Sequence, residues 1–155
     1  MPEIHPIMKK LQWKDHGQPV LIMNAPQAYT EILQAFEGDV HSEPEQASYE
    51  FVQVFGAMNE ELQASARHAV KVLAEDGLLW LCYPKKTSKV YKGSDCIRES
   101  VAGLLAVEGF EPVRQIAIDD DWSALRFRKP ENIKTMVRSF AVTEKGKQRT
   151  ESGQK

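Results

Sequence analysis

Apolar runs alternate with amphipathic segments along this chain, and the pattern predicts an α/β domain. Residues 20–23 and 78–83 are apolar without alternation, which is typical of strands covered on both faces in a parallel sheet. Residues 51–55 are rich in β-forming side chains. A weak edge strand is expected near Val40, and a tight antiparallel hairpin is expected to join 113–118 to 124–128.

Three other segments carry apolar residues at the 3–4 spacing of one helix face, namely 29–36, 62–73 and 97–105. Asn59 is the expected N-cap of the second helix, and Ser94 or Asp95 caps the third. Gly38 lies where a C-cap glycine of the first helix would be. A short amphipathic piece at 7–13 precedes the first strand.

Strands that alternate with helices require a mainly parallel sheet with helices on both faces. We therefore predict a Rossmann-like, three-layer α/β/α sandwich, closed by a C-terminal antiparallel hairpin as in methyltransferase sheets. One domain is expected over 1–130, followed by a basic extension or tail over 131–155. Within that extension, 132–140 can add a helix or strand, whereas 143–155 have almost no apolar residues to bury.

Composition and charge exclude some classes of partner. The chain has 155 residues and a net charge of -2, which gives no overall attraction to nucleic acid or a membrane. The charge is uneven, because residues 129–155 hold seven Lys/Arg and three Glu, about +4, and leave about -6 elsewhere. No apolar signal-peptide core and no run of ~18 apolar residues is present in the sequence.

The two cysteines, Cys82 and Cys96, form no C-x-x-C pair, which favours free thiols in a reducing cytoplasm. A soluble, cytoplasmic protein of bacterial type is the simplest interpretation. We expect Cys82, within an apolar strand, to be inert and buried. Cys96, at a helix start near basic residues, is in the better environment for a thiolate, although no base partner is evident.

Four short motifs follow one another between residues 7 and 128. They are Lys9-Lys10-Leu11, residues 20–26 ending in Asn24-Ala25-Pro26, residues 77–86 ending in Tyr83-Pro84-Lys85-Lys86, and Asp121-Trp122-Ser123-Ala124-Leu125 leading to Phe127. In these motifs the chain resembles a family of short, uncharacterised bacterial proteins classed as a domain of unknown function. The resemblance implies a fold similar to the core of S-adenosylmethionine-dependent methyltransferases and no established activity.

In a doubly wound sheet, ligands bind beyond the carboxyl ends of the strands, where the strand order reverses. By this analogy the candidate ligand-binding residues lie in three strand-end turns and at the start of the hairpin's second strand. They are Asn24, Ala25, Pro26, Gly56, Tyr83, Pro84, Lys85, Lys86, Trp122 and Ser123. For Trp122, a role as a core anchor is favoured over one in ligand binding.

The first turn disfavours S-adenosylmethionine as a cofactor, and no other cofactor is indicated. A methyltransferase or dinucleotide site needs glycines there so that the backbone can approach the cofactor, and Asn24-Ala25-Pro26 has none. Only Glu43 and Glu45 are loosely placed to hold ribose hydroxyls. The simplest interpretation is a turn that merely connects a strand to a helix.

A basic segment follows the strand at 78–83. Residues 84–98 contain Lys85, Lys86, Lys89, Lys92 and Arg98 against Asp95 alone, ahead of a predicted helix N-terminus. Such a segment can bind a small anion. A solvated loop is the alternative, and nucleic acid is a weak option because only Tyr91 could stack on a base.

No metal site is expected. The run Asp119-Asp120-Asp121 is better explained as a hairpin loop, because consecutive carboxylates alternate in direction. The four histidines show no ligand spacing, and His68 is expected at the surface.

Three functions stay open. The leading one is a non-catalytic or cryptic protein that binds a small ligand or anion on a degenerate methyltransferase-like fold. The second is a divergent S-adenosylmethionine-dependent methyltransferase. The third is a protein-interaction module, suggested by the basic tail and the edge strand near Val40. No catalytic residue and no oligomeric state can be assigned from the sequence.

Overall fold

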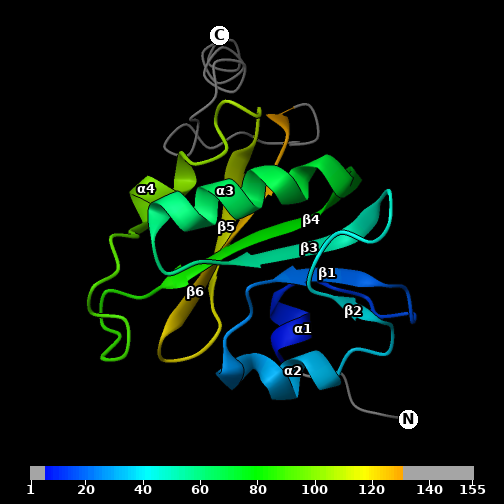
Figure 1. Ribbon diagram of the computed structural model, residues 1–155, viewed down its shortest axis with the longest axis horizontal. Helices are drawn as coiled ribbons and strands as arrows, with labels where there is room; N and C mark the ends of the chain where they lie inside the picture. Colours follow the sequence, from blue (N-terminus) through cyan, green and yellow to red (C-terminus); the bar gives the residue numbers. More distant parts are fainter. Residues whose placement is uncertain (1–5, 131–155) are drawn as a thin grey trace, which may run out of the picture.

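The computed structural model describes residues 6–130, so the predicted extension 131–155 lies outside the described residues. One mixed sheet runs through the molecule (Figure 1). Its strands are β1 (Val20–Met23), β2 (Val40–His41), β3 (Tyr49–Phe55), β4 (Leu73–Pro84), β5 (Glu111–Ala117) and β6 (Trp122–Arg128). The helices are α1 (Pro6–Lys10), α2 (Thr30–Gln34), α3 (Asn59–Ala69) and α4 (Arg98–Ala102), with 3-10 turns η1 (Gln27–Tyr29) and η2 (Val70–Val72).

The sheet has the order β2-β1-β3-β4-β6-β5. Strands β1 to β4 pair in parallel, and β6 runs antiparallel between β4 and β5. From β1 the chain first moves to β2 on one side and then to β3 on the other, so the strand order reverses between β1 and β3. The predicted Rossmann-like sheet with a terminal antiparallel hairpin is confirmed.

Helices cover both faces of the sheet, as the unbroken apolar strands predicted (Figure 1). Helix α3 buries Leu62, Ala66 and Ala69 against one face, where α4 also packs. On the other face, α1 and α2 lie over a cluster that includes the fully buried Phe51 and Trp80. Among the described residues, no helix combines the length and the apolar composition needed to cross a membrane.

A polar side chain, Gln53, is buried beside the apolar cluster under α1 and α2, and no sequence pattern predicted it. The Gln53 side chain, 0% exposed, accepts a hydrogen bond from the Tyr29 hydroxyl at 2.9 Å and donates one to Cys82 Sγ at 3.3 Å. Burial raises the pKa of both Tyr29 and Cys82, so these groups stay protonated at neutral pH. Cys82 is therefore the buried, unreactive free thiol that the sequence predicted.

The ends of three helices differ from the predictions. α4 begins at Arg98 with Ile97 as its N-cap, so neither Ser94 nor Asp95 caps it. Asn59 is the first residue of α3 and not its N-cap, which is Met58. The backbone N–H of Asn59 donates a hydrogen bond to Asp95 Oδ1 of a distant loop at 2.7 Å. Gly38 does not cap α2, which ends at Gln34. Instead Gly38 lies against the carbonyl of Gln18, where a side chain would collide with the backbone.

The helix predicted to continue to Leu73 ends at Ala69, and Leu73 begins β4. The first part of β4 is irregular. Between the pairs Tyr49–Leu73 and Phe51–Leu78, two residue steps on β3 face five on β4, so β4 carries three additional residues. This bulge explains why the apolar pattern of the strand only begins at residue 78.

Replacing Asp95 by Ala should destabilise the fold by about 1 kcal/mol, because the first amide of α3 loses its acceptor. For a domain of this size the expected fall in Tm is about 2–4 °C. Asp120→Ala removes the same charge from an exposed hairpin position and is the matched control. Equal melting temperatures for the two variants in a thermal denaturation experiment would contradict the capping role.

Candidate functional site

Two hollows lie at the carboxyl edge of the sheet, where the sequence predicted a single site for all ten candidate residues. The first, which we call the switch groove, has a volume of about 510 Å³ and lies where the strand order reverses between β1 and β3. The second, the basic pocket, has a volume of about 330 Å³ and lies between the end of β4 and α4. A hydrogen bond from Cys96 Sγ to the Ala57 carbonyl, 3.6 Å long, joins residues that line the two hollows.

The structure divides the ten candidate residues between these hollows. The switch groove is lined by Asn24, Pro26, Gly56 and Trp122. The basic pocket is lined by Tyr83, Pro84, Lys85, Lys86 and Ser123. Ala25 lines neither hollow.

Sequence reasoning missed other lining residues. Glu61 and Ser65 of α3 line the groove, and Gln115 of β5 lines the pocket. These residues lie near the predicted turns because α3 and β5 pack beside them, and no local sequence pattern shows this packing.

Asn24 lines the switch groove between β1 and β3 and is exposed. Its backbone is left-handed, with φ of 60°, a conformation that Asn tolerates better than most residues. The side-chain amide donates to the Phe55 carbonyl at 3.3 Å and to Ser65 Oγ at 3.0 Å. The turn thus contains a left-handed residue although it has no glycine, and the side chain of that residue links the end of β1 to β3 and α3.

Gly56 also serves packing. A Cβ at this position would lie 2.7 Å from Leu62 Cβ and 2.8 Å from Leu62 Cα. The close approach of α3 to the end of β3 therefore requires glycine. The missing side chain makes room for the helix, and Gly56 also lines the groove because of its position at the end of β3.

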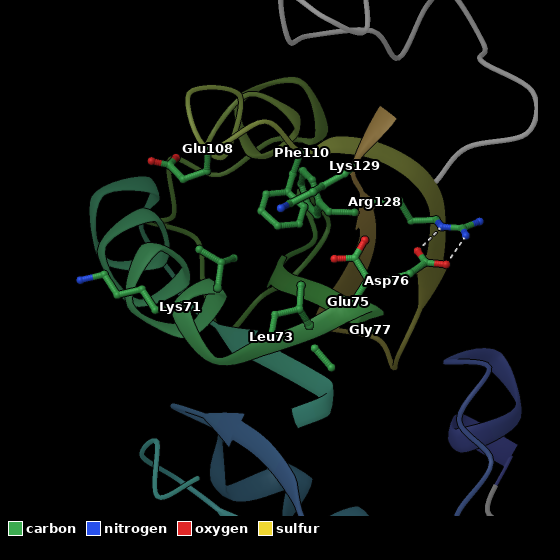
Figure 2. A pocket seen from close by; sticks show the side chains of 12 residues that line it. Lys71, Leu73, Glu75, Asp76, Gly77, Glu108, Phe110, Arg128 and Lys129 are labelled. Atoms are coloured by element: carbon green, nitrogen blue, oxygen red, sulfur yellow. Dashed lines mark hydrogen bonds and ion pairs between the residues drawn. The ribbon is translucent and has the colours of Figure 1, made fainter. Parts of the chain in front are cut away.

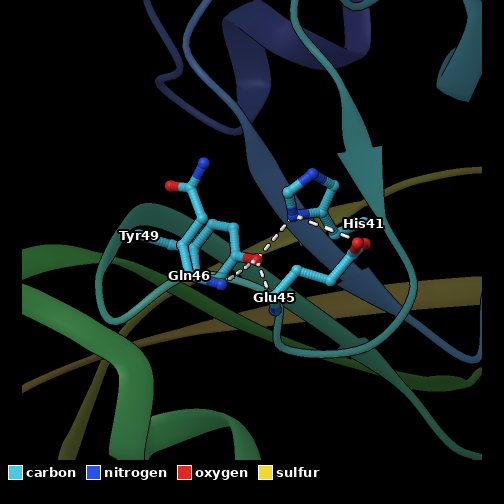
Figure 3. Close-up of polar contacts among 4 residues, drawn as sticks. All are labelled: His41, Glu45, Gln46 and Tyr49. Atoms are coloured by element: carbon cyan, nitrogen blue, oxygen red, sulfur yellow. Dashed lines mark hydrogen bonds and ion pairs between the residues drawn. The ribbon is translucent and has the colours of Figure 1, made fainter.

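The acidic residues considered for ribose binding are placed elsewhere. Strand β2 pairs only with Val20 and Leu21, at the start of β1, and neither Glu43 nor Glu45 lines the switch groove. Glu45 belongs to a separate polar cluster (Figure 3), in which its carboxylate lies 3.7 Å from His41 Nδ1.

In that cluster the Tyr49 hydroxyl accepts the backbone amides of Glu45 and Gln46 at 2.9 and 3.1 Å. With both acceptor sites used, the hydroxyl donates to His41 Nδ1 at 2.6 Å. These contacts fasten the loop between β2 and β3. The switch groove itself is lined by Pro26, which has no N–H to donate to a ligand.

Trp122 has the packing role that the sequence favoured, and it also lines a hollow. Its side chain is 4% exposed and packs edge-on against Phe55 and Tyr91, with ring centroids 5.2 and 4.8 Å apart. It is thus a core anchor whose remaining surface forms a wall of the switch groove.

The acidic hairpin loop organises the basic segment. Asp121 Oδ1 accepts a hydrogen bond from Ser88 Oγ at 2.8 Å, and its carbonyl accepts the Lys85 amide at 2.8 Å. Ser88 Oγ in turn accepts the amides of Val90 and Tyr91 at 3.2 and 3.1 Å. The loop after β4 is therefore held in place by the hairpin.

The remaining carboxylate contacts confirm the hairpin prediction. Asp119 Oδ1 accepts the amides of Asp121 and Trp122, both at 2.8 Å. Within residues 6–130, no group of His, Cys, Asp and Glu could hold a metal ion. His68 is exposed, as predicted.

Two groups of the basic pocket, Tyr83 and Cys96, have raised pKa values. Burial raises the pKa of Tyr83 to about 12, although Arg98 opposes the shift. The Tyr83 hydroxyl accepts a hydrogen bond from Gln115 Nε2 at 3.0 Å, which leaves its own proton for another acceptor. Burial also raises the pKa of Cys96, which is 3% exposed, so the basic residues nearby do not make Cys96 a thiolate.

The helix expected to assist anion binding is too short for that role. α4 has five residues and starts at Arg98. Its few aligned peptide dipoles give little positive potential at the N-terminus. Any anion in the basic pocket would thus be bound by side chains.

Comparison with solved structures shows the fold. A proposed type 11 methyltransferase from Sulfolobus solfataricus matches with a TM-score of 0.53 at 11% identity, over 80% of this chain and 89% of the other. A protein of the NADB-Rossmann superfamily from Streptococcus agalactiae matches with a TM-score of 0.50 at 10% identity, over 83% and 69%. The chain has a methyltransferase-like Rossmann fold.

At such identities the similarity of this Rossmann fold to its neighbours concerns architecture alone. No protein-family model and no curated protein matches the chain. Membership of the bacterial family suggested by the four motifs therefore stays a prediction.

Asn24→Ala should destabilise the protein by about 1–3 kcal/mol, because two hydrogen bonds are lost and alanine disfavours a left-handed backbone. Asn24→Gly loses the same bonds but adopts this backbone freely, so its cost should be smaller by about 1 kcal/mol. Urea denaturation of both variants measures the difference. Equal losses would contradict a conformational role for residue 24.

Proposed function

We propose that this protein binds a small anionic ligand in the basic pocket and does not catalyse a reaction there. The observation that carries the proposal is the gathering of Lys85, Lys86 and Arg98 around one hollow. Ammonium and guanidinium groups are the side chains that recognise phosphates and carboxylates most strongly. A cytoplasmic location, suggested by the two free cysteines, is part of the proposal.

The charges and donors of the basic pocket support an anion as its ligand. In the described part of the chain, Glu99 is the single carboxylate that lines the pocket beside the three basic residues. The Tyr83 hydroxyl adds a neutral donor, and Thr87 and Ser123 add two further hydroxyl groups. A volume of about 330 Å³ suits a ligand at the small end of the usual range.

The fixed position of the basic segment also supports binding. The contacts of Asp121 with Lys85 and Ser88 hold the backbone that carries the two lysines before any ligand arrives. A pre-organised loop reduces the entropy that binding must overcome. Ser88 is 4% exposed, whereas a loop that is merely solvated would leave such a serine accessible to water.

A binding role is favoured over catalysis by the protonation of the pocket groups. A thiol or phenol attacks a substrate, or takes up a proton, mainly as its anion. The raised pKa values of Cys96 and Tyr83 keep both groups neutral at physiological pH. In this state they can donate hydrogen bonds to a ligand.

Exchanging both Lys85 and Lys86 for Ala should weaken the binding of inorganic phosphate or pyrophosphate at least tenfold, because each charged hydrogen bond contributes about 1.5–3 kcal/mol. Thermal stabilisation by a panel of anions, followed by calorimetry with the strongest one, measures the effect. Lys89→Ala combined with Lys92→Ala removes the same charge from exposed positions of the same loop that do not line the pocket. Unchanged stabilisation in the first variant, or equal loss in both, would contradict the proposal.

A divergent S-adenosylmethionine-dependent methyltransferase is the second candidate function, supported by the fold. Because Pro26 removes an amide donor from the first turn and neither Glu43 nor Glu45 lines the switch groove, we expect calorimetry with millimolar S-adenosylmethionine to give no heat of binding. Saturable heat would favour the methyltransferase. A role as an interaction module depends on the basic extension 131–155, which lies outside the described residues.

A further inference from the structure

A third cavity, the bulge pocket, lies at the opposite edge of the sheet from the basic pocket (Figure 2). Its volume is about 290 Å³. It is formed where the first residues of β4 meet the last residues of β6 and the segment that ends at Phe110. The two pockets share no lining residue, so the bulge pocket is independent of the proposed anion site.

The wall of this pocket is the bulge of β4, in which three additional residues leave the ladder between Leu73 and Leu78. Asp76 has a left-handed backbone, with φ of 51°. Its two carboxylate oxygens accept hydrogen bonds from Arg128 Nε and Nη2 at 2.9 and 2.6 Å. This bidentate pair holds the bulge against β6, and bulges of this kind re-aim side chains.

The floor of the bulge pocket is apolar and rigid. Phe110 and Phe127 are 5% and 0% exposed, and Leu73 and Val70 pack against the same core cluster. A cavity of this size with such a floor fits a small ligand with an apolar body.

Two charges of opposite sign face the cavity. Figure 2 shows the side chains of Glu75 and Lys129 directed into it, with Lys129 Nζ 5.7 Å from the centre of the Phe110 ring. Within the described residues, neither group has an ion-pair partner. The other carboxylates of the rim are neutralised, Asp76 by Arg128 and Glu108 by Arg67.

We propose that the bulge pocket binds an amino acid with a hydrophobic side chain, such as leucine or phenylalanine. Glu75 receives the α-ammonium group, Lys129 receives the α-carboxylate, and the side chain lies on Phe110 and Phe127. An ammonium and a carboxylate on one apolar body is the ligand chemistry that complements both charges and the floor together. A simple fatty acid or amine would leave one of the two charges without a partner.

Calorimetry of the full chain with phenylalanine and leucine tests the proposal, with three comparison ligands. These are 3-phenylpropanoate, which lacks the amine, phenethylamine, which lacks the carboxylate, and serine, which lacks the apolar body. We expect saturable binding of the two hydrophobic amino acids and binding at least tenfold weaker for each comparison ligand. Equal binding of 3-phenylpropanoate and phenylalanine, or no binding of either amino acid at about 10 mM, would overturn the proposal.

Substitutions separate this pocket from its surroundings. Glu75→Gln and Lys129→Gln each remove one exposed charge and should weaken phenylalanine binding about tenfold to a hundredfold. Lys71→Gln is the matched control, because Figure 2 shows the Lys71 side chain directed away from the cavity. Retention of full affinity in Glu75→Gln would overturn the assignment. The Lys85→Ala, Lys86→Ala variant should bind phenylalanine normally, whatever its affinity for anions.

Discussion

Burial of both faces of β3 and β4 is the constraint on which the structure depends. These strands lie at the middle of the sheet, with Phe51 and Trp80 toward one layer of helices and Val52 and Leu79 toward the other. Such strands cannot offer polar side chains to a ligand along their length. The one buried exception, Gln53, is satisfied within the core by Tyr29 and Cys82. Chemistry is therefore confined to the two edges where the strands end.

At the carboxyl edge, the same packing leaves two separate hollows. The switch groove has the place of a cofactor site, but Asn24 ties β1 to β3 and to α3 across it. The basic pocket lies one strand further along, on a loop that the hairpin holds through Asp121. A methyltransferase-like architecture can thus keep its strand order while the polar groups at its edge move from one crevice to the next.

The core strands, their order and the hairpin were predictable because each rests on local apolar runs and on topology rules. The predictions failed where a contact joins distant residues. Asp95 caps a helix that starts 36 positions earlier in the chain, and no pattern near Asn59 indicates this. In the sequence, the residues around Asp76 look like the end of a helix. The bulge that they form is stabilised by Arg128, which lies 52 positions away and leaves no local signal. For the site, residue types in each turn were predictable, whereas their division between two hollows follows from the packing of distant elements, such as the contact between Cys96 and Ala57.

The bond between Asp121 and Ser88 joins a loop to a hairpin 33 positions away in the sequence. During synthesis, β1, β3 and the helices between them emerge well before β6. The lysine-rich loop cannot make these contacts until the last hairpin lies beside β4. A chain interrupted before residue 121 therefore retains the lysines without their arrangement.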